Sequence, residues 1–471
     1  MPENKRFDVV VIGAGVVGCA MARRFTLEGA RVAILERATD ILAGASKANS
    51  AILHTGFDAP EGSLELECVR AGYQEYQNIR GSLGLVQDNA GAYVVAWKKA
   101  GLSKLEALKA RAHRNGITDV ELVSAETLKA QEPNLSDKAL GAAFVPTESL
   151  IDPWSAPYVY LHQAIENGAH LMTSCDVTSG VFDGEHWRLD TTMGSVEARV
   201  VINCAGLYGD LVDQALLGAS DFTIKPRKGQ FVVFDKAASK LLSSIILPVP
   251  SKTTKGIVLF RTVFGNLAVG PTAEEQRSRT DTTTDEQTLK ALIADAVTKV
   301  PALKDMPVTA TYAGLRPATE NNDYQILPKS DRNWITVGGI RSTGLSGALG
   351  IAQYVYRLYS EMGRSHEPLA NPATPQANQL AEGAARDWTR GTGGEVVCHC
   401  ELVTKREIET ALSGPLRARS IDGLKRQTRA TMGRCQGFYC AARLAELTSG
   451  HFERPLAEKF DDYEGLRNEQ Q

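Results

Sequence analysis

The sequence feature that most constrains how this chain can fold is a glycine-rich turn close to its start. The apolar run at residues 8–12 leads into Gly13, Gly15 and Gly18, and a helical pattern follows them. In such a motif the first glycine permits a tight turn, the second lets a pyrophosphate approach the backbone, and the third lets helix and strand pack closely. We therefore expect a strand, a turn and a helix whose N-terminal N–H groups bind a phosphate.

A second strand pattern and an acid complete this unit. Residues 31–35 are mostly apolar and end at Glu36, which lies 18 residues after Gly18. That distance is close to the spacing of about 20 residues at which a carboxylate binds a ribose hydroxyl. The ordered set of strand, glycines, helix, strand and acid predicts a site for an adenine dinucleotide. These observations alone do not distinguish FAD from NAD as the bound dinucleotide.

Composition limits the class of protein. The chain has 471 residues, enough for two or three domains, and its 43% hydrophobic and 23% charged residues are typical of soluble globular proteins. A net charge of −3 argues against nucleic-acid binding. No apolar run reaches the roughly 18 residues of a membrane span, and residues 1–6 do not read as a signal peptide. We expect a cytoplasmic protein, with peripheral attachment to the inner membrane through a partner as a further option.

Residues 44–56 are small and polar, then apolar, and contain His54 two positions before a glycine. At this segment the chain resembles FAD enzymes of the glycerol-3-phosphate dehydrogenase and D-amino-acid oxidase superfamily. The resemblance implies that the segment runs along the pyrophosphate towards the isoalloxazine, with His54 near the flavin. His54 is then the candidate base for a hydroxyl proton, since histidine titrates near neutral pH. The alternative is a histidine that only bonds backbone groups.

Two further segments carry the same resemblance. A strand pattern at residues 196–203 runs into Cys-Ala-Gly, and another at residues 334–338 runs into a glycine turn and a helix. Three such segments in the superfamily's order favour FAD over NAD. With the glycine motif, the residues expected to bind FAD are Gly13, Gly15, Gly18, Glu36, Arg37, Ser46, Asn49, Ser50, Ala205, Gly206, Gly339, Gly344 and Leu345.

Two arginines are candidates for holding an anionic substrate. By the resemblance, Arg316 in a Gly-x-Arg-Pro sequence enters the pocket over the flavin. A guanidinium can bind a carboxylate or phosphate through two parallel hydrogen bonds. The alternative is a surface arginine paired with Glu320 or Asp323. Arg341, after the last glycine turn, is the second candidate.

Four cysteines close to the C-terminus predict a metal centre. They stand as Cys398-x-Cys400, a gap of 34 residues, and Cys435-x4-Cys440, a set that suits a [2Fe–2S] cluster or structural zinc. The sequences C-x-C-E, L-K-R-x-T-R and M-G-x-C-Q-G resemble the bacterioferritin-associated-ferredoxin-like [2Fe–2S] domain, which the large subunits of anaerobic glycerol-3-phosphate dehydrogenases carry. This resemblance implies that electrons leave the flavin through the cluster to a partner subunit or a quinone system.

Together these observations predict an α/β chain with three parts. A Rossmann-type FAD-binding domain takes residues 1–90, 140–221 and 330–363, and an inserted α+β substrate domain takes residues 91–139 and 222–329. Residues 364–394, rich in Ala, Pro, Asn and Gln, form a linker or wrapping arm. Residues 395–471 form a small helical [2Fe–2S] module.

The expected function is an FAD-dependent dehydrogenase that oxidises a small anionic hydroxy substrate similar to glycerol 3-phosphate. After Gly338-Gly339 the glycerol-3-phosphate enzymes have a lysine, whereas this chain continues Ile340-Arg341. That form is closer to L-2-hydroxyglutarate dehydrogenases and amino-acid oxidases. A 2-hydroxy acid dehydrogenase, a hydroxyproline- or opine-type amine dehydrogenase subunit of a hetero-oligomer, and a non-enzymatic electron-transfer subunit therefore remain alternatives. A homo-oligomer is also compatible with the sequence. A direct NAD(P)H oxidoreductase is disfavoured, because only one dinucleotide-binding unit is visible.

Overall fold

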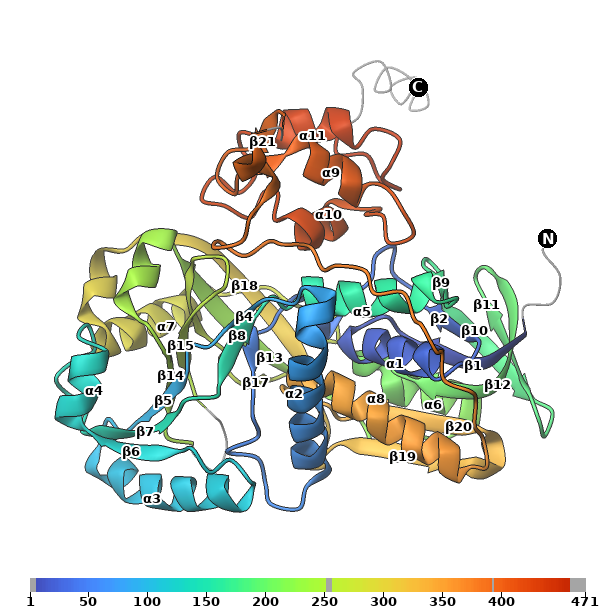
Figure 1. Ribbon diagram of the computed structural model, residues 1–471, viewed down its shortest axis with the longest axis horizontal. Helices are drawn as coiled ribbons and strands as arrows, with labels where there is room; N and C mark the ends of the chain where they lie inside the picture. The colour runs from blue at the N-terminus through green and yellow to red at the C-terminus, as the bar shows by residue number, and fades with distance from the viewer. Residues whose placement is uncertain (1–5, 251–255, 392–393, 458–471) are drawn as a thin grey trace, which may run out of the picture. The chain divides into compact units, whose positions relative to one another are not determined.

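The computed structural model describes residues 6–250, 256–391 and 394–457, and the chain divides into two compact units, residues 1–384 and 385–471 (Figure 1). The first unit contains two large sheets and a small one, and the second contains a two-stranded sheet and short helices. Among the described residues, no helix combines the length and apolar character that crossing a membrane requires.

One part of the first unit is organised around an eight-stranded sheet. Its central strand, β1 (Arg6–Ile12), pairs in parallel with both neighbours, and Val9, Val10 and Val11 are completely buried. A parallel strand covered on both faces reads as a continuous apolar run, which is the pattern before the glycines. The strand order is β10 (Val177–Phe182), β11 (Trp187–Thr191), β12 (Gly194–Asn203), β1, β2 (Val32–Leu35), β9 (His170–Met172), with β20 (Trp334–Gly338) beside β12 and β19 (Gln325–Lys329) beside β20.

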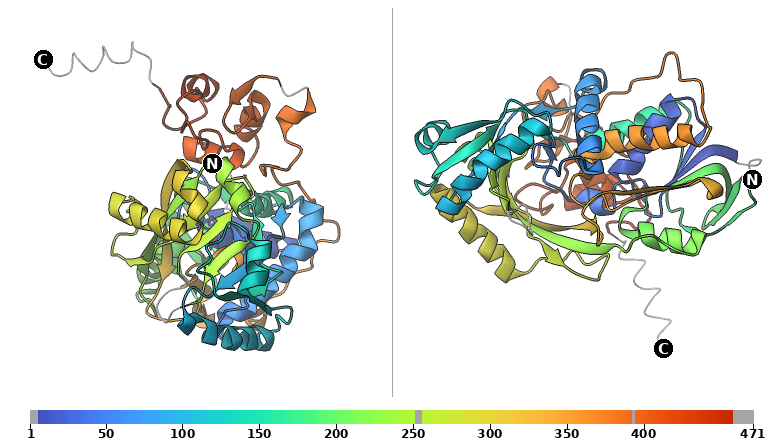
Figure 2. Two further views of the ribbon diagram at one scale, coloured as in Figure 1. Left: turned by 90° about the vertical axis from the view of Figure 1, so that its left-hand side faces the viewer. Right: turned by 90° about the horizontal axis from the view of Figure 1, so that it is seen from below.

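Helices follow the carboxyl ends of the parallel strands in this sheet. Helix α1 (Val16–Leu27) follows β1, α6 (Gly209–Leu217) follows β12, and α8 (Gly344–Glu361) follows β20. α1 packs against α8 and α5 (Ser155–Glu166), and α2 (Leu64–Leu83) packs along α8 (Figure 2). Because β1, β12 and β20 run in parallel, the starts of the helices that follow them lie at one edge of the sheet, where such folds bind dinucleotides.

The other part of the first unit is a nine-stranded, mainly antiparallel sheet. Its order is β17 (Glu274–Glu275), β13 (Lys225–Phe234), β16 (Leu267–Gly270), β15 (Val258–Arg261), β14 (Ile245–Pro248), β5 (Ala92–Val95), β7 (Gly141–Val145), β6 (Glu121–Ser124), with β18 (Val308–Ala318) beside β13. Helix α7 (Glu286–Lys299) packs on β13 and β16, while α3 (Lys99–Arg114) and α4 (Ala125–Gln131) pack on β6 and β7.

Two strands lie in a different sheet from the one that the expected domain boundaries predict for them. Gly141–Val145 was expected in the FAD-binding part, but it pairs with β5 and β6 in the nine-stranded sheet. Gln325–Lys329 was expected in the substrate part, but it pairs with β20 in the eight-stranded sheet. Both differences arise because strand pairing depends on partners that are distant in the sequence.

A three-stranded sheet made of β3 (Ile52–Leu53), β8 (Ser149–Ile151) and β4 (Gln87–Asp88) joins segments that are far apart in the sequence. Its antiparallel register puts Leu53 opposite Ser149. The next residues along each strand are therefore His54 and Glu148, which this pairing brings face to face.

Residues 364–384 run along the first unit. The N–H of Leu369 donates to the Leu27 carbonyl, the N–H of Glu382 donates to the Val263 carbonyl, and Leu380 and Ala381 are buried in the core of the nine-stranded sheet. The second unit begins at residue 385, ten residues before the expected 395.

The second unit consists of β21 (Val396–Cys398), β22 (Val403–Thr404), α9 (Lys405–Ala411), α10 (Ile421–Thr428) and α11 (Ala441–Leu447). Thr404 and Glu407 form a reciprocal capping box at the start of α9. The core of the unit contains two of the four clustered cysteines, Cys398 and Cys440.

Candidate functional site

One cavity of about 560 Å³ in the first unit coincides with the expected dinucleotide site. Its volume lies in the range of about 300–1,000 Å³ that is typical of ligand pockets. All of the residues expected to bind FAD line it, except Gly18. At Gly18 a Cβ atom would collide with the Gly13 carbonyl, so this glycine serves the close packing of helix and strand.

The glycine turn forms a cradle that suits a phosphate. Gly13 has φ +101°, and a Cβ there would lie 2.7 Å from the Cys204 carbonyl oxygen. Gly15 caps α1 without a side chain, and the Val16 N–H donates to Ser46 Oγ at 3.0 Å. A helix N-terminus that opens into a cavity is a favourable site for a phosphate.

The acid of the motif is oriented by the backbone. Glu36 Oε2 accepts from the Ala14 N–H at 2.8 Å, and Oε1 accepts from the Ala38 N–H at 2.9 Å. Both carboxylate oxygens are thereby fixed at the cavity wall. The cavity, the glycine cradle and this carboxylate together fit an adenine dinucleotide.

The structure pairs His54 with a buried carboxylate that sequence reasoning missed. Glu148, whose side chain is 0% exposed, accepts from His54 Nδ1 at 2.8 Å and from the N–H and Oγ1 of Thr55 at 2.6 and 2.9 Å. With Nδ1–H bound to a carboxylate, Nε2 is left as the acceptor atom. The His54 side chain is 18% exposed; His54 stands four residues after Ser50, the last of the cavity-lining residues 43–50, and is not among the lining residues itself.

Arg316 lines the cavity and is partly buried. Its Nη2 donates to the Thr272 carbonyl at 2.7 Å, and among the described residues no carboxylate forms an ion pair with it. Burial, with a smaller effect of Arg227, lowers the pKa of Arg316 to about 10, so the guanidinium stays charged near neutral pH.

The two acids considered as surface partners of Arg316 bond elsewhere. Glu320 accepts from the Thr223 N–H, and Asp323 accepts from the backbone at the start of α2. The charge of Arg316 therefore faces the cavity without compensation from these two acids.

Arg341 also lines the cavity, but it differs from Arg316. Its guanidinium forms an ion pair with Glu65, whose side chain is 5% exposed and which also accepts from Thr343 Oγ1 at 2.8 Å. Arg341 itself has φ +49°, a strained conformation for a non-glycine residue. With its charge matched by Glu65, Arg341 is less suited than Arg316 to bind an anion.

The four cysteines of the second unit are free thiols that lie as two adjacent pairs. Cys400 is in hydrogen-bond contact with Cys435, and Cys398 with Cys440. The backbone N–H groups of residues 437–439 point at the Cys435 sulfur and lower the pKa of its thiol. Within the described residues, no three His, Cys, Asp or Glu side chains are grouped closely enough to hold one metal ion. Two pairs of cysteine side chains that receive backbone N–H groups nevertheless have the chemistry of a [2Fe–2S] ligand set, which binds them as thiolates.

Comparison with known families agrees with both sites. The family described as FAD dependent oxidoreductase matches residues 8–358, and the BFD-like [2Fe-2S] binding domain matches residues 396–448. The matched domains bind FAD and indicate a [2Fe–2S] cluster, so the zinc alternative is not favoured.

Individual proteins are similar along nearly the whole chain. A glycerol 3-phosphate dehydrogenase from Caloramator mitchellensis is 32% identical over 467 residues, which cover 98% of this chain and 97% of that protein. An anaerobic glycerol-3-phosphate dehydrogenase subunit from Escherichia coli K12 is 24% identical and covers 94% of this chain and 88% of its own length. The solved L-alpha-glycerophosphate oxidase from Mycoplasma pneumoniae matches 80% of this chain and all of its own, with a TM-score of 0.75 and 24% identity, which supports the fold.

Proposed function

This chain belongs to the family of FAD-dependent oxidoreductases, and from that premise we propose that it is a dehydrogenase of glycerol 3-phosphate whose electrons leave through the [2Fe–2S] module. The observation that carries the choice of an anionic substrate is Arg316, a charged guanidinium at the cavity wall that has no ion-pair partner among the described residues. The full-length similarity to a glycerol 3-phosphate dehydrogenase supports the particular substrate.

Each residue has a distinct part in this proposal. Arg316 binds the phosphate of the substrate through parallel hydrogen bonds. His54 removes the proton of the reacting hydroxyl through Nε2, while Glu148 holds the ring and stabilises the positive charge that develops on it. FAD bound in the cavity would supply the acceptor for the hydride, and a cluster held by the four cysteines would supply a one-electron carrier.

The four cysteines Cys398, Cys400, Cys435 and Cys440 are the proposed cluster ligands. The electron acceptor is then a partner protein or a quinone system that meets the second unit. Peripheral attachment to the inner membrane through such a partner is part of the proposal.

An anaerobic titration tests the proposed substrate. The purified protein is mixed with sn-glycerol 3-phosphate, L-2-hydroxyglutarate or proline-type amines while the flavin absorbance near ~450 nm is followed. We expect glycerol 3-phosphate to bleach the flavin at the lowest concentration. Bleaching by only a 2-hydroxy acid or an amine would reassign the substrate, and no bleaching by any of them would refute the dehydrogenase proposal.

A further inference from the structure

A segment of the nine-stranded sheet reaches across to the dinucleotide-binding part of the first unit. Residues 271–282 contribute Pro271, Arg279, Thr280 and Thr282 to the wall of the cavity. Pro271 lies at the end that contains Arg316, since a Cβ on the neighbouring Gly229 would meet both of these residues. The segment therefore links the expected substrate end of the cavity to another part of its wall.

The far part of this segment is fixed by an ion pair. Arg279 donates from Nη1 and Nη2 to the two carboxylate oxygens of Asp210, at 2.6 and 2.8 Å, and also donates to the Leu207 carbonyl. Asp210 lies in the first turn of α6, four residues after Gly206 of the dinucleotide site. Its side chain is only 6% exposed, so the pair is largely shielded from water.

The ring of Tyr208 extends this contact along the cavity. The guanidinium of Arg37 lies over Tyr208 at 3.6 Å from the ring centre, and that of Arg279 lies 5.8 Å from the same centre. Arg37, Tyr208 and Arg279 all line the cavity. The loop that carries Arg279 thus shares the ring of Tyr208 with Arg37, the residue that follows Glu36, at the end of the cavity expected to hold the ribose.

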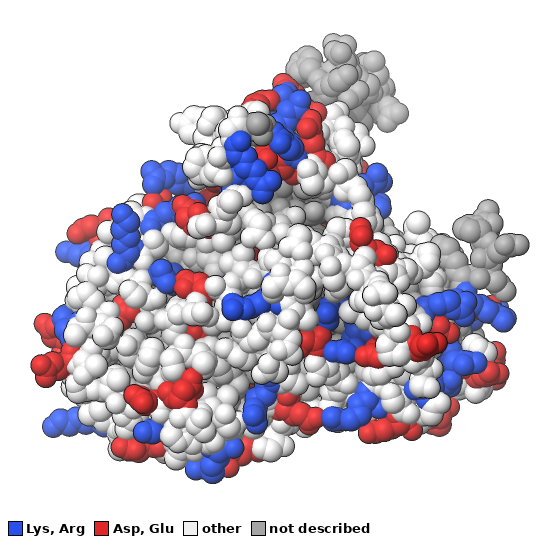
Figure 3. Space-filling model, in the orientation of Figure 1, with Lys and Arg blue, Asp and Glu red and all other residues white. Residues whose placement is uncertain are grey.

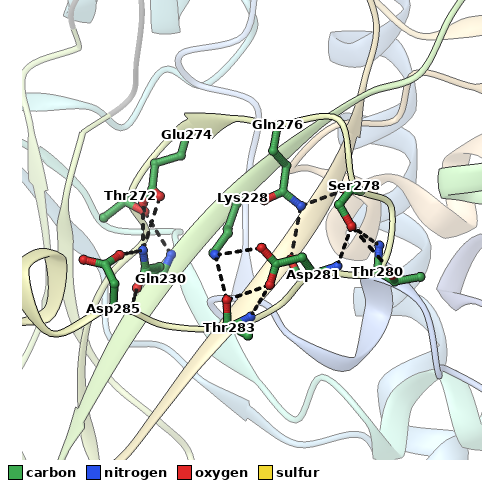
Figure 4. A network of polar contacts seen from close by, with 10 residues as sticks. All are labelled: Lys228, Gln230, Thr272, Glu274, Gln276, Ser278, Thr280, Asp281, Thr283 and Asp285. Atoms are coloured by element: carbon green, nitrogen blue, oxygen red, sulfur yellow. Dashed lines mark hydrogen bonds and ion pairs between the residues drawn. The ribbon is translucent and has the colours of Figure 1, made fainter.

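The segment is held in shape by its own polar side chains (Figure 4). Ser278 Oγ accepts from the N–H groups of Thr280 and Asp281, and Asp281 Oδ1 accepts from the N–H and Oγ1 of Thr283. Gln276 Nε2 closes the loop by donating to the carbonyls of residues 278 and 281. Because these hydrogen bonds are already formed, the loop does not need to become ordered when a ligand binds.

Both ends of the loop are tied to β13. Gln230, which is completely buried, donates to Glu274 and Asp285 and accepts from the Asp285 N–H at 2.9 Å. Lys228 lies 3.5 Å from Asp281. Since the base is fixed and the tip is bound to α6, the loop is built to span the cavity.

We propose that residues 276–283 form a cover that retains FAD, and that Arg279 is the cofactor-retaining residue which fastens this cover to Asp210. Without the ion pair, the cover keeps its internal hydrogen bonds but is no longer attached to α6. FAD then leaves faster, because the part of the wall that includes Arg279 can move aside.

The test measures FAD release and needs no substrate. Arg279→Gln removes both hydrogen bonds to Asp210, and Arg279→Lys keeps the charge but loses the parallel geometry. The matched control is Arg114→Gln, which removes another arginine–carboxylate contact, in which two guanidinium nitrogens donate to Oε1 of Glu61, from an exposed position outside the cavity. Release of FAD from each holoprotein is followed by the rise in flavin fluorescence after dilution, at a temperature where circular dichroism shows each apoprotein folded.

We expect Arg279→Gln to release FAD about tenfold or more faster than the wild type, Arg279→Lys to lie between them, and Arg114→Gln to match the wild type. Unchanged release from Arg279→Gln would overturn the proposal, even if its melting temperature fell, because Arg279 would then brace the fold only. Equal acceleration in Arg114→Gln would overturn it as well. Failure of this proposal leaves the substrate assignment untouched, since no substrate is present.

Discussion

Glu148 is the residue that changes most how His54 is understood. From the sequence alone, the His54 side chain is compatible with a role in bonding backbone groups. Its backbone N–H donates to Ser346 Oγ at 2.8 Å, a contact that does not involve the ring. The imidazole, however, is held by a fully buried carboxylate. A ring oriented through Nδ1 presents Nε2 in a fixed direction, which is how proteins prepare a histidine for proton transfer.

Replacing His54 by Asn should slow flavin reduction by substrate about 10²–10⁴-fold, the usual contribution of a general base. Glu148→Gln should slow it less, because the ring keeps its place but loses the adjacent negative charge. Anaerobic stopped-flow absorbance measures both. The control is His162→Asn, which removes a histidine paired with Glu166 on the surface of α5 and should reduce at the wild-type rate. Normal reduction in His54→Asn would rule out His54 as the base.

Some individual residues of the site could be predicted from the sequence, and others could not. The residues expected to bind FAD form short motifs in which each glycine has a local reason, and all but Gly18 line one cavity. Glu148 has no such motif: it stands after a Pro-Thr step and meets His54 only because β3 pairs with β8. The partnership of Arg341 with Glu65 is equally invisible, since 276 positions separate the two residues.

At the scale of elements, the pairing of β13 with β18 positions Arg316. The register places Gly229 opposite Gly314 and Arg227 opposite Arg316. A Cβ on Gly314 would lie 2.9 Å from Ala48, so this glycine lets β18 approach the expected FAD segment. A Cβ on Gly229 would collide with the guanidinium of Arg316. Two glycines therefore make the room in which the arginine lies at the cavity.

Gly229→Ala should accordingly displace Arg316 and raise the KM for substrate about tenfold or more, because hydrogen bonds to a charged group are worth roughly 1.5–3 kcal/mol. Arg316→Gln should raise KM at least as much, and the double variant should add little to it. Steady-state kinetics with a dye acceptor provide the measurement. Gly81→Ala is the control, because a Cβ there meets nothing within 4 Å. Additive effects of the two changes would mean that Gly229 acts by another route.

Helices and strands could be predicted from the sequence less consistently than the short motifs. The buried strands β1 and β20 could be read from continuous apolar runs, since parallel strands are covered on both faces. The pattern of residues 122–132 predicts a helix, yet residues 121–124 form β6 at the edge of the nine-stranded sheet and α4 begins only at Ala125. Four residues are too few to distinguish strand from helix by periodicity, and the pairing with β7 decides the outcome.

Charged residues of both signs are mixed along the chain, and the surroundings of the cysteines differ between the two units. Lys, Arg, Asp and Glu are interspersed on the face that Figure 3 shows, in keeping with the net charge of −3. Four cysteines of the first unit are all buried, and burial raises the pKa of Cys68 to about 12, which makes that thiol inert near neutral pH. In the second unit, N–H groups of the backbone lower the pKa of Cys435, whereas burial raises the pKa of Cys400 and raises that of Cys440 to about 12. Cys435 therefore differs from the buried thiols of the first unit, and Cys440 resembles them.

Cys435→Ser should remove iron and the broad absorbance of the cluster but leave the bound FAD and its reduction by substrate. Electron delivery to a one-electron acceptor should fall sharply, because the flavin loses its single-electron outlet. Metal analysis, visible spectra and acceptor assays on the full chain check this, with Cys68→Ala in the first unit as control. Zinc in place of iron in the wild-type protein, or iron retained by Cys435→Ser, would contradict the proposed ligand set.

The walls of the dinucleotide cavity come from stretches that are far apart in the chain: the glycine turn at residues 13–17, the segment at residues 204–208 and the turn at residues 339–345. A ribosome therefore has to synthesise the chain as far as about residue 345 before the last of these walls exists. The nascent chain has to hold an incomplete nucleotide site through most of its synthesis, and capture of the cofactor is a late event in its biogenesis. The second unit, in contrast, is one uninterrupted stretch from residue 385 onward, so its four thiols emerge together after the nucleotide site is complete.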